Sequence, residues 1–285
     1  MTRLPYVAKR AEELLGSSVV ATAPVAGGDI STATRIRLSD GTTALVKTHH
    51  QAPEGFFDAE ARGLRWLAEA GGVAVPEVLG GDHECLILRW VEPGKSTIDA
   101  AVSFGQALAA THLAGAPSYG LDDDGFIGRL PLPNKTAPTW AEFYATRRVL
   151  PYLKLARDRG AASETEADAI EAVIGRFADL LPEEPPSRLH GDLWNGNVLW
   201  SLDGVIRVID PAAYGGHRET DLAMLSLFGL PHLPRVMDAY AEAAPLADGW
   251  EERLGLHQLF PLLVHSCMFG GGYAARAAAI AERHT

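Results

Sequence analysis

One short segment of the sequence carries the residue types that phosphoryl transfer requires. It reads His-Gly-Asp-Leu-Trp-Asn-Gly-Asn over residues 190–197, and Asp210 follows at the end of an apolar run. Kinases use this spacing because the base must face the attacking hydroxyl while two oxygen ligands hold magnesium beside the phosphates. The pattern therefore predicts Asp192 as the base and Asn197 and Asp210 as the magnesium ligands. The competing interpretation is that these residues only form turns.

A lysine and a glutamate further upstream are candidates for positioning the phosphates of ATP. Lys47 lies in the apolar run ALVKTH, and Glu60 follows it in a segment of helical periodicity. A strand lysine paired with a helix glutamate performs this task in kinase-like folds. Alone, Lys47 would be interpreted as a solvated strand lysine. Its occurrence in the expected order before Asp192 favours the phosphate-positioning role.

Two other segments are candidates for nucleotide binding. Gly27 and Gly28 lie between two β-rich runs, where a flexible hairpin could bring backbone amides to phosphate, although most glycine pairs only turn the chain. The run ILRWV at 87–91 leads out of the first third of the chain. Within it, Arg89, Trp90 and Val91 are the predicted hinge whose backbone hydrogen-bonds adenine.

The first third of the chain must form a small sheet crossed by one helix. Residues 19–48 alternate β-branched residues with turn residues, which predicts a three-stranded antiparallel meander. Apolar residues at spacings of three and four predict a helix over 56–70, and two more strands are predicted over 75–80 and 85–91. A short amphipathic helix over 5–15 precedes the sheet.

Helical patterns dominate beyond Glu92-Pro93-Gly94, so we predict an N-terminal lobe over 1–91 and a mainly helical lobe over 92–285. The β-rich run 187–216, which holds Asp192 and Asp210, is an island in this helical part and indicates a functional insert. The predicted fold class is α+β. Helices are expected over 98–114, 139–159, 164–181, 219–229 and 233–243, followed by a closing apolar pair.

Composition and charge exclude several classes of protein. The 25 Lys+Arg and 36 Asp+Glu give a net charge of −11, which lacks the basic surface that nucleic acids require. Cys85 and Cys267 predict buried thiols in a reducing cytoplasm rather than a disulfide framework. The first residues lack an apolar signal core, and the charge-free stretch 254–275 contains Pro261 and three consecutive glycines. We therefore expect neither export nor membrane insertion.

These residues resemble the fructosamine kinases, also called ketosamine 3-kinases, within the protein-kinase-like fold that includes aminoglycoside and choline kinases. The most specific stretches are HGDLWNGNVLW at 190–200 and IDPAAYGGHRETDLAM at 209–224. Similar stretches extend over nearly the whole chain, at 27–31, 45–49, 57–64, 119–128 and 140–156.

The resemblance implies a two-lobed fold and an enzyme that uses ATP and Mg²⁺ to phosphorylate the 3-hydroxyl of a fructosamine, either free or on a glycated lysine side chain. In the family this phosphate destabilises the ketoamine, which breaks down and frees the amine. Residue by residue, it makes Asp192 the acceptor of the hydroxyl proton, Asn197 and Asp210 the magnesium ligands, and Lys47 with Glu60 the phosphate-positioning pair.

Trp194 and His217 are the candidate substrate contacts. An indole beside the base could cover the apolar face of a ketose, and it could equally pack under the loop. His217 lies in the GGHRE stretch that, with Trp194, favours fructosamine over other acceptors. The chain departs from the family at 130–134, where it reads Leu-Pro-Leu-Pro-Asn and relatives tend to read Thr-Pro-Gln before an asparagine. Selectivity is expected to differ if that glutamine touches substrate.

Two other functions remain open at this point. An aminoglycoside or other amino-alcohol kinase would share the base, metal and lysine positions. A nucleotide-binding regulator without catalysis would usually have lost one of the polar groups at 47, 192, 197 and 210, and all four are present. The eleven positions from Asp210 to Asp221 are too few for the peptide-docking activation segment of protein kinases, which favours a small acceptor.

Overall fold

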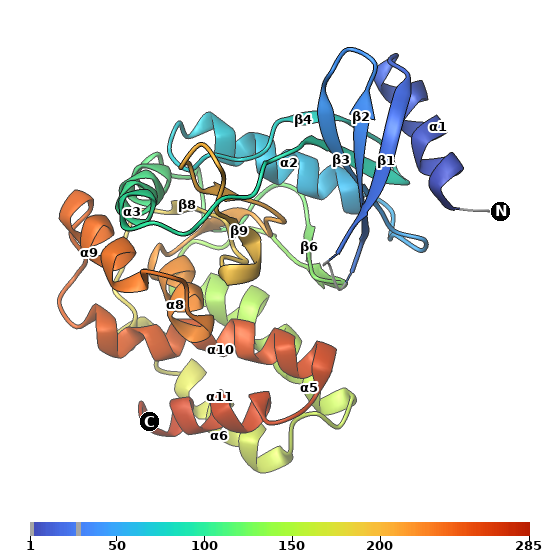
Figure 1. The fold of residues 1–285 in the computed structure, drawn as a ribbon. Coiled ribbons are helices and arrows are strands. Elements are labelled where there is room, and N and C mark those ends of the chain that lie inside the picture. Colours follow the sequence, from blue (N-terminus) through green and yellow to red (C-terminus); the bar gives the residue numbers. More distant parts are fainter. Residues whose placement is uncertain (1–2, 27–29) are drawn as a thin grey trace.

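The N-terminal part of the chain forms the antiparallel sheet that the sequence predicts. In the computed structural model, which describes residues 3–26 and 30–285, the strands are β1 (Val19–Val25), β2 (Thr32–Leu38), β3 (Thr43–Thr48), β4 (Val78–Gly81) and β5 (Cys85–Arg89). They pair in the order β1-β2-β3-β5-β4, and each pair is antiparallel. Figure 1 shows this sheet at one end of the molecule, with the helical part at the other.

Two helices cover the two faces of the sheet. Helix α1 (Arg3–Leu15) packs Val7 and Ala11 with Val46 and Ile87, whereas α2 (Phe56–Glu69) packs Leu64 and its neighbours with Leu86 and Leu88. Successive residues of a strand point to opposite faces. The face under α2 therefore also receives Lys47, which pairs in register with Leu86.

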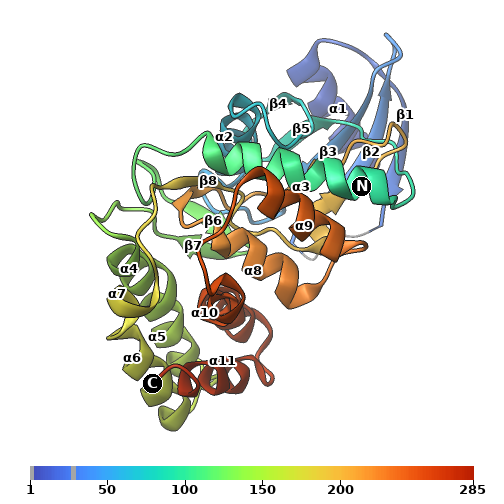
Figure 2. The ribbon, with the colours of Figure 1, turned by 90° about the vertical axis from the view of Figure 1, so that its left-hand side faces the viewer.

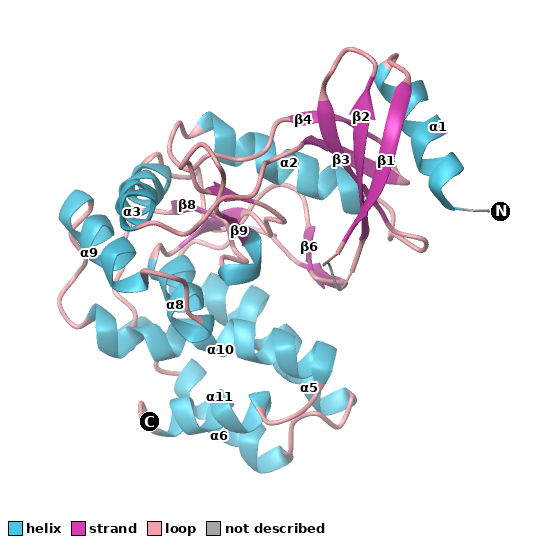
Figure 3. Ribbon diagram, viewed as in Figure 1, coloured by secondary structure: helices cyan, strands magenta, loops and turns pink. Residues whose placement is uncertain are grey.

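Helices dominate the rest of the chain, which confirms the α+β class (Figure 3). The predicted helix over 139–159 contains a π-helical turn, and the one over 164–181 is broken after Gly175, which is its C-cap. The helical elements are α3 (Ile98–Leu113), α4 (Trp140–Phe143), η1 (Tyr144–Val149), α5 (Leu150–Asp158), α6 (Glu164–Ile174), α7 (Phe177–Leu180), α8 (Glu219–Phe228), α9 (Leu233–Ala243), α10 (Trp250–Phe269) and α11 (Tyr273–Glu282).

Short strands hold the β-rich island inside this helical part. Strand β8 (Ser187–Leu189) pairs with β11 (Tyr214–Gly216), and between them a 3-10 turn η2 (Asn195–Asn197) leads into the hairpin β9 (Val198–Leu199) and β10 (Arg207–Val208). A further hairpin, β6 (Gly125–Ile127) and β7 (Leu130–Leu132), was not predicted. β5 ends at Arg89 and α3 begins at Ile98, so the predicted boundary near residue 92 lies in the linking segment.

Most of the charge-free stretch near the C-terminus is buried inside the protein, although Phe269 is half exposed. It forms α10 and the start of α11, which pack with α5 and α6 (Figure 2). Across residues 3–26 and 30–285, we find no helix with the length and apolar character needed to cross a membrane. Cys85 and Cys267 are buried free thiols, as predicted.

Candidate active site

Lys47 connects the sheet, helix α2 and the segment after β10. Its ammonium Nζ lies 2.6 Å from Glu60 Oε1 and 2.6 Å from Asp210 Oδ1. The register of β3 places Lys47 on the face that α2 covers, and Glu60 is one of the buried residues of α2. The strand–helix ion pair expected from the sequence is therefore present, and Asp210 completes a three-membered cluster.

The two carboxylates keep the lysine charged. Burial lowers the pKa of Lys47, but the nearby charges of Asp210 and Glu60 outweigh that effect, so its pKa is raised overall. Burial raises the pKa of Glu60, and the Asp210 charge adds to this rise against the opposing effect of Lys47. A permanent cation thus faces the cavity, where it can bind phosphate oxygens.

The loop with Asp192 is held by a buried carboxylate of helix α8. Asp221 accepts hydrogen bonds from the backbone amides of His190 at 2.8 Å and Gly191 at 2.9 Å. Its Oδ2 also lies 3.1 Å from Nε2 of the buried His112. Gly191 has φ 80°, and a Cβ there would overlap the carbonyl oxygen of Ala212. Sequence reasoning missed the roles of Asp221 and His112, although DLAM marked the segment of Asp221.

Asn197 holds Asp192 in place from the following turn. Its Nδ2 donates to the backbone carbonyl of Asp192 at 2.8 Å and to Asp192 Oδ2 at 3.0 Å. Burial raises the pKa of Asp192 to about 7, the Asn197 hydrogen bond lowers it, and the charges of Asp210 and Asp221 raise it. A carboxyl group with a pKa near neutrality suits a general base, because it can both accept and release a proton.

Asn197 and Asp210 offer oxygen atoms that fit a magnesium ion. Since Nδ2 of Asn197 donates to Asp192, its amide Oδ1 is left to accept or to ligate. The side chain of Asp210 is 43% exposed, and its φ of 54° is unusual for a residue other than glycine. Such backbone strain is concentrated at functional sites, and hard oxygen donors are what Mg²⁺ prefers.

These groups line one cavity of about 850 Å³ between the sheet and the helical part. Lys47, Glu60, Asp192, Asn197 and Asp210 all contribute to its walls. Gly27 and Gly28, predicted to approach phosphate, lie outside the described residues. The flanking residues 25–26 and 30–31 line the cavity.

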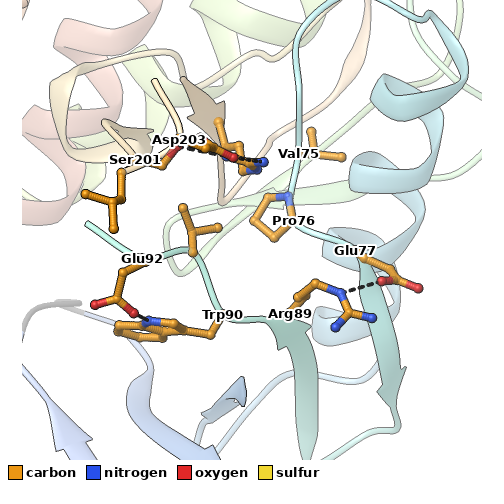
Figure 4. Close-up of a pocket in the computed structure, with 11 residues that line it drawn as sticks. Val75, Pro76, Glu77, Arg89, Trp90, Glu92, Ser201 and Asp203 are labelled. Carbon is orange, nitrogen blue, oxygen red and sulfur yellow. Dashed lines mark hydrogen bonds and ion pairs between the residues drawn. The ribbon is translucent and has the colours of Figure 1, made fainter. Parts of the chain in front are cut away.

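All three residues of the predicted hinge line the same cavity. Arg89, Trp90 and Val91 line it, but the Arg89 side chain bonds to Glu77 and the Trp90 indole donates to Glu92. Figure 4 shows these two contacts beside a smaller groove of about 490 Å³. The Trp90 amide already donates to Thr43, whereas no hydrogen bond among the described residues uses the Val91 amide. The Val91 amide is thus the better candidate for adenine.

The two candidate substrate contacts lie in different surroundings. Trp194 lines the cavity, and its ring centroid is 6.0 Å from that of Phe228. His217 is 1% exposed and does not line the cavity; its ring stacks on His257 at 5.0 Å, close to Trp140. Because a buried ring in the core cannot meet a substrate, we do not retain His217 as a substrate contact.

Both the sequence and the fold of this chain are similar to those of known proteins. The family model described as fructosamine kinase matches residues 5–284. A Thermus thermophilus protein named as a probable ketoamine kinase is 38% identical over 251 residues, which cover 88% of each chain. A Thermobifida fusca protein whose crystal structure is assigned to the fructosamine-3-kinases is 50% identical, with a TM-score of 0.93 and coverage of 98% of each chain. A choline kinase of Streptococcus pneumoniae has a TM-score of 0.66 at 15% identity over 98% of this chain and 97% of that one, which shows the shared fold alone.

Proposed function

The chain belongs to the fructosamine kinase family, and we propose that it transfers the γ-phosphoryl group of ATP to the 3-hydroxyl of a ketosamine. It is a kinase, and curated relatives named as ketoamine kinases cover most of its length. The observation that carries the proposal is the convergence of Lys47, Asp192, Asn197 and Asp210 on one cavity.

Asp192 acts as the base in this proposal. Its carboxylate accepts the proton of the acceptor hydroxyl as that oxygen bonds to the γ-phosphorus, and the bond to the β-phosphate oxygen breaks to release ADP. Asn197 orients the carboxylate through Oδ2. Lys47, held by Glu60, binds phosphate oxygens and offsets their charge.

Asn197 Oδ1 and Asp210 would hold magnesium beside the phosphates. Their donor set of one amide oxygen and one carboxylate is of the kind that Mg²⁺ accepts. When bound there, Mg²⁺ would supply positive charge that stabilises the phosphate oxygens. The base is a separate group, Asp192.

Trp194 is the proposed sugar contact, because it lines the cavity from the same loop as Asp192. An indole face packs well on the apolar face of a sugar. The acceptor is a fructosamine, either as a small molecule or as a glycated lysine side chain. The cytoplasmic location expected from the two thiols remains a prediction.

The relatives give the alternative acceptors less support than a ketosamine, since they are named as probable ketoamine kinases. The structural likeness to choline kinase lies at an identity that shows only the fold. The idea of an inactive regulator is disfavoured, because the base, the lysine and both candidate ligands all line the cavity.

A coupled assay of ADP release tests the proposal. The acceptors are fructosyl-lysine, an aminoglycoside, choline and buffer alone. We expect ADP release that depends on fructosyl-lysine. Equal release with buffer, or faster release with the aminoglycoside or choline, would contradict the ketosamine assignment.

A further inference from the structure

Arg148 is a buried cation that has no carboxylate partner among the described residues. Its side chain is 0% exposed and belongs to the π-helical turn η1. The guanidinium carbon lies 3.8 Å from the centroid of the Tyr214 ring and 4.7 Å from that of Phe143. A buried charge without an ion pair is costly, so a position that needed only volume would hold an apolar residue. Arg148 therefore has a task besides filling the core.

The guanidinium is directed at the segment that follows β7. Its Nη1 donates to the carbonyl of Pro133 at 2.6 Å, and its Nη2 donates to Oδ1 of Asn134 at 2.6 Å. Asn134 is 1% exposed, so water does not compete for these bonds. Charge-assisted hydrogen bonds in a dry site are strong, and this one fixes which way the Asn134 amide points.

Asn134 passes this constraint to a wall of the cavity. Its Nδ2 donates to the carbonyl of Asp123 at 3.1 Å, and its backbone amide donates to Asp124 Oδ1 at 2.7 Å. Its carbonyl accepts from the amide of Leu121 at 3.0 Å. Residues 121–126 and Asn134 line the cavity, whereas Arg148 does not. Arg148 thus holds this wall from behind.

The contacts that this wall makes with helix α2, on the side away from Arg148, are weaker. Asp123 lies 3.6 Å from Nε of Arg62 on α2, but these side chains are 72% and 48% exposed, and water screens such an ion pair. The ring of Phe126 lies 5.3 Å from that of Phe56. β6 lies beside α2 (Figure 1). The buried contacts of Asn134 therefore dominate the placement of residues 121–124, and the pairing of β6 with β7 carries this placement on to Gly125 and Phe126.

We propose that Arg148 is a positioning residue for acceptor binding: acting through Asn134, it places residues 121–126 against the ketosamine. The candidate nucleotide contacts come from the sheet and the hinge, which leaves this wall of the helical part for the acceptor. This inference rests on the proposed function of the cavity. It assigns a role to the segment 130–134, which ends at Asn134.

Asn134→Asp is the first test, because it keeps an oxygen for Arg148 and replaces the donor to the Asp123 carbonyl with an oxygen that cannot donate. We expect a wild-type melting temperature or higher. The KM for the acceptor should rise about tenfold, while kcat at saturating acceptor and the KM for ATP stay within about twofold, as for a loss of acceptor binding alone.

Arg148→Lys is the second variant, since one ammonium group cannot reproduce the two-pronged contact with Pro133 and Asn134. It should shift the acceptor KM in the same direction. Arg157→Lys on α5 is the control, because Arg157 makes only surface ion pairs with Glu164 and Glu171, and it should keep wild-type constants.

Each assay uses whichever acceptor of the panel the wild-type enzyme phosphorylates, so failure of the fructosamine assignment is separable from failure of this inference. An unchanged acceptor KM in folded Asn134→Asp would overturn the inference. An equal rise of both KM values, or a fall in kcat alone, would also overturn it, because either result indicates a general structural effect.

Discussion

At Asp192, burial and the Asn197 hydrogen bond act on the same carboxyl group with opposite effects on its pKa. Asp192→Asn keeps the shape of the side chain but cannot accept the hydroxyl proton. Turnover should fall about 10²-fold or more, because general-base catalysis contributes at least that much. ATP affinity, measured separately by titration calorimetry, should be nearly unchanged. Retention of more than about a tenth of wild-type turnover would remove Asp192 from the base role.

Asp210 is the residue on which the magnesium proposal depends most. Asp210→Ala removes a carboxylate oxygen from the cavity and one partner of Lys47. We expect loss of Mg²⁺-dependent activity over a full magnesium titration. The control is Asp203→Ala, which changes an exposed carboxylate bound to Arg207 outside the cavity. A magnesium dependence that is unchanged in Asp210→Ala would disprove the ligand assignment.

We expect His217 to make the stability of the fold depend on pH, because its ring is buried in the core and does not line the cavity. Burial lowers its pKa to about 3, helped by His257 and Arg218 and opposed by Glu219 and Glu184. The unfolded chain binds the proton of this histidine more readily than the folded chain does. Above the unfolded pKa of about 6.5, His217 therefore does not reduce the free energy of unfolding, and below it the free energy of unfolding falls as the pH falls.

The expected loss from His217 between pH 7 and 5 is about 2 kcal/mol of unfolding free energy. Glu219, whose pKa is lowered to about 2, changes the stability only as the pH falls below the unfolded glutamate pKa of about 4.3, which lies under this window. Urea denaturation of His217→Gln at both pH values should show a smaller loss than the wild type. The variant of the exposed His83, His83→Gln, should behave like the wild type. Equal losses in all three proteins would contradict the burial argument.

The residues brought together at the site were largely predictable from the sequence, because their chemistry depends on fixed spacing along the chain. Lys47, Glu60, Asp192, Asn197 and Asp210 line one cavity, although their individual roles remain proposals. The supporting groups could not be predicted. Asp221 contacts two backbone amides, and Arg148 contacts the Pro133 carbonyl and the Asn134 side chain, which only the folded chain brings near.

At the scale of elements, the helix pair α3 and α9 packs closely because Gly105 has no side chain. A Cβ at this position would overlap the carbonyl oxygen of Val236 and lie 3.1 Å from Cβ of Ala239. Gly105→Ala should lower the free energy of unfolding by about 1–3 kcal/mol, because backbone atoms must move apart. Gly175→Ala, whose Cβ would make an ordinary 3.6 Å contact, is the control and should be nearly neutral. Thermal denaturation of both variants tests this packing argument, and equal melting temperatures of the two variants would refute it.

Helices and strands were predicted correctly where the sequence shows a single clear hydrophobic periodicity. The meander β1–β3 and helix α2 were predicted because alternation and helical spacing are clear there. The hairpin β6–β7 was missed because Pro131 argues against a strand, and short paired edges tolerate proline. The π turn in residues 139–159 was missed because one inserted residue barely alters the apolar spacing.

The net charge of −11 favours a cationic acceptor over a neutral one. A kinase of this family must neutralise the ATP phosphates with a few cations, here Lys47 and the proposed Mg²⁺. An acidic protein attracts a cationic acceptor, and a fructosamine carries a protonatable amine that fructose lacks. Overall architecture was predictable from the sequence since the diagnostic segments span nearly its full length. The sequence left the amine partner of the sugar open.

Phosphorylation of fructosyl-lysine and of fructose by the wild-type enzyme, with the product located by phosphorus-coupled NMR, tests the central claim most directly. We expect efficient, ATP-dependent phosphorylation of fructosyl-lysine on its 3-hydroxyl and much weaker activity with fructose. Comparable efficiency with both sugars, or phosphate on a different hydroxyl, would contradict the assignment of a ketosamine 3-kinase.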